Sequence, residues 1–178
     1  MNPRIEIFQE GYWIQNCDRL KFCADTLIEK LLLIKDEKRI NSLEQNYKMR
    51  ALLETNLLLL GYAVENLLKG YLIYKFLKYG DIPEHADLTF LEKKVWETKK
   101  THNLVILAKN CKLHFTEREL NHMKKLSKYT TWKGRYHIPK DSDGIAGLIQ
   151  AGTGDTMTSD DTKIVEDLII NIKNKIRE

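Results

Sequence analysis

Near the middle of the chain, 21 consecutive residues from Leu57 to Leu77 read LLLLGYAVENLLKGYLIYKFL. The segment is long enough to be mistaken for a membrane span, but Glu65, Lys69 and Lys75 interrupt it. Each charge at a bilayer centre costs about 2.5–3.5 kcal/mol on insertion scales. A helix that is apolar on nearly every face is instead typical of the middle of a helical bundle. We therefore expect the central helix of a soluble protein that does not contact a membrane.

On both sides of this segment, apolar residues recur with a helical period near 3.6, and no segment alternates with period 2 over the length of a strand. The expected helices cover 10–34, 43–78, 88–98, 104–108, 116–130 and a last segment that starts near 159 or 160. The fold class that follows is an all-α antiparallel helical bundle with two long helices and several short ones. A chain of 178 residues has the length of one domain, with the N-terminal helix packed on the rest.

The turns between these helices are also marked in the sequence. Thr116 and Glu119 have the spacing of a capping box, which begins a helix. The residues from Trp132 to Pro139 include a glycine and a proline, so the chain is expected to leave the helix there. A long segment rich in Gly, Ser, Thr and Asp follows at 140–161. Loops of this length inside a domain are usually functional or disordered.

The long central helix contains residues that its apolar character does not favour. Gly61 and Gly70 each cost about 1 kcal/mol relative to Ala inside a helix, which would be explained by the close approach of a neighbouring helix. Glu65 and Lys69 are four residues apart, in the favourable orientation for a helix ion pair. We expect a structural pair, and a polar site that faces a groove or a partner chain is the alternative.

The composition excludes several classes of protein. The chain is 43% hydrophobic, which is too apolar for a disordered protein, and its 3 Pro and 9 Gly exclude fibrous classes. Three cysteines without a Cys-x-x-Cys pair do not fit a disulfide framework or a structural zinc site. Cys17, Cys23 and Cys111 are therefore expected to be buried thiols of a cytoplasmic protein. We expect no metal ion and no cofactor.

The positive charge is confined to one segment of the chain. The whole chain holds 29 Lys+Arg and 25 Asp+Glu, a net charge of +4. Residues 116–140 carry seven basic and two acidic side chains, and the rest of the chain has a net charge of −1. The same segment contains Tyr129, Trp132 and Tyr136. Because cations contact phosphates and aromatic rings stack on bases, this mixture is typical of proteins that bind single-stranded RNA or a nucleotide.

The turn at the end of this segment supplies the candidate ligand-binding residues. Lys133, Arg135 and His137 would contact phosphate, and Trp132 or Tyr136 would stack on a base. The competing interpretation is structural. In that case a solvated helix face is followed by aromatic side chains that pack on the core.

Candidate catalytic residues come from pairs of arginine and histidine. Arg118 and His122 lie one helical turn apart, and Arg135 and His137 lie in the turn. An arginine that stabilises charge and a histidine that transfers a proton are the minimum for RNA cleavage without a metal. The alternative for Arg118 and His122 is an ordinary exposed helix face. His102 precedes a short helix, and we expect it to cap that helix or form a buried hydrogen bond, with ligand contact as the alternative.

Three segments resemble motifs of HEPN (higher eukaryotes and prokaryotes nucleotide-binding) domains. The run GYAVENLLKGYLI at 61–73 resembles the Glu-x-x-x-Lys core helix of that family. The run THNLVILA at 101–108 looks like its Gly-His-x-Leu-x-x-Leu segment, with Thr in place of the first Gly. The run WKGRYHIP at 132–139 is similar to the Arg-Tyr-Pro turn of many prokaryotic members, with His137 where Pro is common.

This resemblance implies a HEPN-like core at about 43–178 that forms a homodimer and binds RNA or a nucleotide. It also implies a protein partner, such as a cognate antitoxin or a nucleotidyltransferase. Many members are ribonucleases of toxin–antitoxin, abortive-infection or CRISPR systems, in which four to six residues separate Arg from His. Here three residues separate Arg118 from His122, and one separates Arg135 from His137.

Three functions are open from the sequence. The first is a HEPN-like protein of a prokaryotic defence or toxin–antitoxin system that binds RNA or a nucleotide. The second is a metal-independent ribonuclease that acts as a dimer. The third is a dimeric interaction module without catalysis, in which the helix at 57–77 supplies the dimer face.

Overall fold

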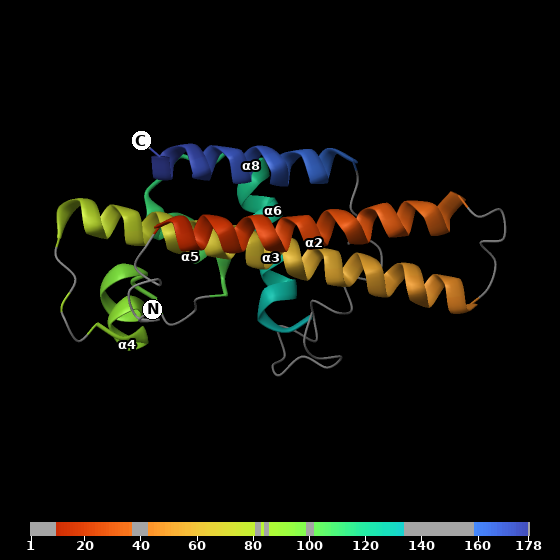
Figure 1. Ribbon diagram of the computed structural model, residues 1–178, viewed down its shortest axis with the longest axis horizontal. Helices are drawn as coiled ribbons and strands as arrows, with labels where there is room; N and C mark the ends of the chain where they lie inside the picture. The colour runs from red at the N-terminus through yellow and green to blue at the C-terminus, as the bar shows by residue number, and fades with distance from the viewer. Residues whose placement is uncertain are drawn as a thin grey trace.

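The structure is a computed structural model, and it describes residues 10–36, 43–80, 83, 86–98, 102–133 and 159–177. Every regular element in these ranges is helical, which confirms the all-α bundle (Figure 1). The α-helices are α2 (Glu10–Asp36), α3 (Leu43–Tyr79), α4 (Leu88–Phe90), α5 (Leu104–Cys111), α6 (Glu117–Lys128) and α8 (Ser159–Arg177). Two π-helical turns, η1 (Leu91–Val95) and η2 (Tyr129–Lys133), extend α4 and α6.

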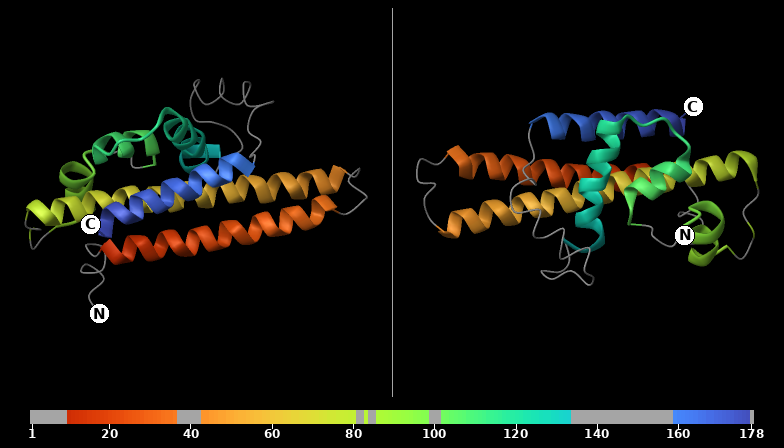
Figure 2. Two further views of the ribbon diagram at one scale, coloured as in Figure 1. Left: turned by 90° about the horizontal axis from the view of Figure 1, so that it is seen from above. Right: turned by 180° about the vertical axis from the view of Figure 1, so that it is seen from behind.

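The long helix α3 lies at the centre of this arrangement. α2 runs antiparallel to it along most of its length, and α8 lies beside both (Figure 1). The ammonium groups of Lys21 on α2 and Lys173 on α8 pair with Glu166 and Asp18 on the opposite helix. α5 and α6 cover the side of α3 that faces away from α2, and α6 crosses the long axis of the bundle (Figure 2). The sequence from Leu57 to Leu77 is apolar on most faces because α3 has neighbours on several sides.

The burial of α3 bears on two expectations from the sequence. By length and composition it is the one described helix that could cross a membrane, and half of its most apolar window is buried inside the fold. Most of its residues from Leu57 to Ile73 are covered by the protein's own helices. These buried positions contact the protein's own helices, and the expected dimer face at 57–77 stays a prediction.

The π-helical turns differ from what the sequence predicts. The helix expected at 88–98 is a short α-helix followed by η1, which ends at Val95. The chain was also expected to leave the helix at Trp132, but η2 continues through Lys133. Tyr129 and Thr130, the first two residues of η2, lie in the core, where each is at most 1% exposed. Rules based on neighbouring residues do not predict a turn that depends on packing against distant segments of the chain.

The cysteines are partly as expected. Cys17 and Cys111 are buried, and burial raises the pKa of each thiol to about 12. The Sγ of Cys111 also donates to the carbonyl of Leu68 at 3.6 Å. Cys23 is exposed on α2, which corrects the expectation that all three thiols are buried.

We predict that a thiol reagent such as dithionitrobenzoate labels one cysteine of the native protein at pH 8 and all three after unfolding. The thiolate is the reactive form, so a raised pKa and burial both protect Cys17 and Cys111. The Cys23→Ser variant is the control and should show no rapid labelling. Rapid labelling of more than one thiol in the native protein would contradict the buried positions.

Candidate functional site

A largely buried polar cluster joins α3 to His102, which lies two residues before the start of α5. Each carboxylate oxygen of Glu65 has one partner among the described residues: Lys69 Nζ lies 2.6 Å from Oε1, and His102 Nδ1 lies 3.0 Å from Oε2. The Glu65 and Lys69 side chains are 6% and 11% exposed, whereas that of His102 is 40% exposed. The expected structural pair of Glu65 and Lys69 is confirmed, and the contact with His102 is an addition that the sequence did not predict. We call these three residues the Glu65 cluster.

Neighbouring elements fix the position of His102. Its carbonyl accepts a hydrogen bond from Thr130 Oγ1 at 2.8 Å, which ties it to η2. Its ring makes a T-shaped contact with the Tyr62 ring, with centroids 6.3 Å apart. Asn103 caps α5 by accepting from the backbone N–H of Ile106, so the capping role expected for His102 belongs to the next residue. The hydrogen-bonding role expected for His102 is confirmed.

The geometry of the Glu65 cluster sets the tautomer of His102. A carboxylate can only accept, so Nδ1 carries the proton in this contact, and Nε2 is the acceptor of the neutral ring. Among the described residues no partner lies on Nε2. Lys69 Nζ also lies 4.6 Å from the centroid of the Trp96 ring, a cation–π contact that supports the buried charge. The cluster thus presents an oriented imidazole near η2, which suits hydrogen bonding to a ligand or proton transfer.

The second part of the candidate site is the exposed face of α6. The capping box that begins this helix is confirmed, with the Thr116 N–H donating to Glu119 Oε2 at 2.7 Å and the Glu119 N–H donating to Thr116 Oγ1 at 3.2 Å. Met123 and Leu126 on the opposite face are buried in the core. The α6 basic face, as we call it, consists of Arg118, His122, Lys124, Lys125 and Lys128, each exposed or half-buried.

Arg118 and His122 lie together on this face, one turn apart. His122 Nδ1 donates to the carbonyl of Arg118 at 2.8 Å, because a carbonyl oxygen can only accept. Nε2 is therefore the ring atom that can accept a proton when the ring is neutral. An arginine and a histidine thus lie one turn apart, as the sequence suggested, although no described contact joins them to the Glu65 cluster.

The candidate residues are spread along α6 rather than gathered in one cleft. α6 has 12 residues and is about 18 Å long. Arg118 lies at its N-terminal end, while η2 and its hydrogen bond to His102 follow its C-terminal end. Trp132 and Lys133 belong to η2 by their backbone, and the remaining candidates Arg135, Tyr136 and His137 lie outside the described residues, as do residues 140–158 of the expected loop.

The comparisons with known proteins give no further guidance. No protein-family model, curated protein or solved structure matches the chain. Within the described ranges, no group of three or more His, Cys, Asp or Glu residues could hold a metal ion.

Proposed function

We propose that this protein is a HEPN-like protein that binds single-stranded RNA along the α6 basic face. The observation that carries the proposal is the position of the charge: α6, the helix in the first half of the segment that holds the positive excess, has one buried face and one basic face, with four lysines and arginines against two glutamates. Phosphate contacts supply most of the affinity of such surfaces.

The length of the face favours a strand over a single nucleotide. Its four lysines and arginines extend over most of a helix of about 18 Å, which is too long for one phosphate group to contact them all. His102 lies apart from this face, because its carbonyl accepts from Thr130 Oγ1 on the buried side of η2.

The test is the salt dependence of RNA affinity, measured by fluorescence anisotropy with a labelled single-stranded RNA of mixed sequence. Four phosphate contacts predict a slope of log K against log[salt] of about −2.8, since each contact on a single strand contributes about −0.7. In the double variant Lys124→Ala/Lys128→Ala the slope should fall to about −1.4, with weaker binding at low salt. These two lysines lie one turn apart on the exposed side of α6.

The matched control is Lys30→Ala/Lys163→Ala, which removes the same charge from exposed positions of α2 and α8. It should leave the slope near the wild-type value. No RNA binding at about 50 mM salt, or an equal loss in both double variants, would refute the proposal. Cleavage of the RNA that disappears in His122→Ala would support the ribonuclease alternative, for which His122 has a suitable tautomer.

A further inference from the structure

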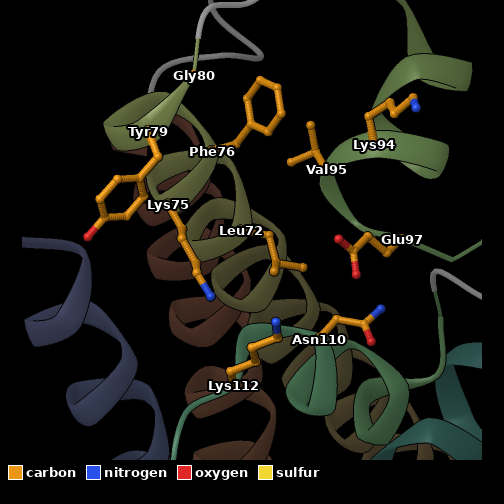
Figure 3. A pocket seen from close by; sticks show the side chains of 10 residues that line it. All are labelled: Leu72, Lys75, Phe76, Tyr79, Gly80, Lys94, Val95, Glu97, Asn110 and Lys112. Atoms are coloured by element: carbon orange, nitrogen blue, oxygen red, sulfur yellow. The ribbon is translucent and has the colours of Figure 1, made fainter.

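A cavity of about 260 Å³ lies near the C-terminal end of α3, between that helix, η1 and the end of α5 (Figure 3). Leu72, Phe76 and Val95 form its apolar walls. The Asn110 side chain also lines it, and its Nδ2 donates to the carbonyl of Trp96 at 2.7 Å. This hydrogen bond links the end of η1 to α5, so these two elements, which form walls of the cavity, keep their relative position.

Charged side chains surround this apolar centre. Figure 3 shows Lys75 and Lys112 directing their ammonium groups toward the space in front of Leu72, with the Glu97 carboxylate facing it from the side of η1. Lys94 lies on the rim, so three lysines and one glutamate give the cavity a net charge of +2. Among the described residues, none of these three lysines forms an ion pair with a carboxylate.

The backbone at the cavity is unusual. Glu97 and Lys112 have φ angles of 53° and 56°, and they are the two non-glycine residues with positive φ among those described. Glycine adopts this conformation more readily, and it is the common residue at the helix end where Lys112 lies. Residues held in such conformations cluster at ligand sites. Here both of them direct a charged side chain into one cavity.

We propose that this cavity binds a small phosphate monoester with a flat apolar group, at a site separate from the α6 basic face. The phosphate lies between Lys75 and Lys112, and its dianionic charge matches the net charge of the cavity. The ammonium group of a lysine acts as a point charge, and such groups commonly bind phosphate in proteins. The flat group packs against Leu72 and Phe76, and Glu97 accepts a hydrogen bond from a hydroxyl or amino group of the ligand. The volume is slightly below the range of about 300–1,000 Å³ for drug-sized ligands, so the ligand is small.

The experiment is an NMR titration of the full chain with phenyl phosphate and adenosine 5′-monophosphate, and with benzoate and adenosine as comparison compounds. Both phosphates should saturate the protein and shift the signals of Leu72, Val95 and Asn110. Benzoate should bind more weakly because it carries one charge, and adenosine more weakly because it carries none. A phosphate site that accepts carboxylates equally well would overturn the choice of ligand class.

The decisive variant is Lys112→Gly, which removes one ammonium group and places glycine at a position that favours it. The variant should fold at least as stably as the wild type, yet bind phenyl phosphate about tenfold or more weakly, since one charged hydrogen bond is lost. Lys109→Ala, which removes a charge from an exposed position of α5 outside the cavity, should bind as the wild type does. The proposal would be overturned if the wild type and Lys112→Gly bound phenyl phosphate with equal affinity. It would also be overturned if the NMR signal changes were confined to residues 118–128, or if about 10 mM phenyl phosphate did not saturate the protein. Because the RNA test uses other lysines, either proposal can fail while the other stands.

Discussion

Replacing Glu65 with alanine should lower the free energy of unfolding by about 3–5 kcal/mol, the usual cost of removing one partner of a buried ion pair. Lys69 Nζ is 2.6 Å from the Glu65 carboxylate, and the lysine side chain is only 11% exposed. Without the carboxylate, the ammonium group is left with the Trp96 ring, which cannot replace a hydrogen-bonded anion. Urea denaturation followed by circular dichroism measures the effect as a lower midpoint.

The double variant Glu65→Leu/Lys69→Met is the control that separates the loss of charge pairing from the loss of packing. Because apolar replacements of buried ion pairs are often neutral or stabilising, most of the stability should return in the double variant. His102 loses its Nδ1 acceptor in both variants, so the nitrogen chemical shifts of its ring should change equally in the two. A loss below about 1 kcal/mol for Glu65→Ala would show that water reaches Lys69 and that the pair is not buried in solution.

The parts of the fold that local signals encode were predicted well. The predicted helix starts agree with the structure for α3, at Leu43, and for α8, at Ser159, and so does the predicted capping box at Thr116. Each of these features depends on residues within one or two helical turns. The pairing of Glu65 with Lys69 was predicted for the same reason, since the two lie on adjacent turns of one helix.

Features that depend on distant segments were missed. Glu65 and His102 are 37 residues apart, and no spacing rule indicates that they meet. The lysines of the cavity come from α3, η1 and the end of α5, and each of them alone looks like an ordinary surface residue. Trp132 was expected outside the helix because Gly and Pro residues follow it, but it belongs to the π-helical turn η2. The same turn contains Thr130, whose contact with His102 the sequence did not predict. Sequence reasoning therefore found the basic segment but could not place the groups around it.

The close approach predicted at Gly61 is also found, and it leads to the second large effect. A Cβ added at Gly61 would lie 2.5 Å from Thr130 Cγ2 and 3.3 Å from the carbonyl oxygen of Leu126. Thr130 cannot rotate away without losing its hydrogen bond to His102, and Leu126 offers rigid backbone. Gly61→Ala should therefore destabilise the protein by about 2 kcal/mol, although alanine is favoured over glycine by about 1 kcal/mol inside a helix.

Thr130→Ser provides a specific rescue of that variant. Serine keeps the hydroxyl that donates to the His102 carbonyl and lacks the methyl group that the new Cβ would meet. In a double-mutant cycle measured by urea denaturation, Gly61→Ala/Thr130→Ser should recover about 1 kcal/mol relative to the sum of the single variants, as expected for residues in contact. Additive effects, or a stabilising Gly61→Ala, would mean that η2 moves away from α3 without cost. The Gly61–Thr130 contact would then not fix the position of His102, and its imidazole would not be held in one orientation.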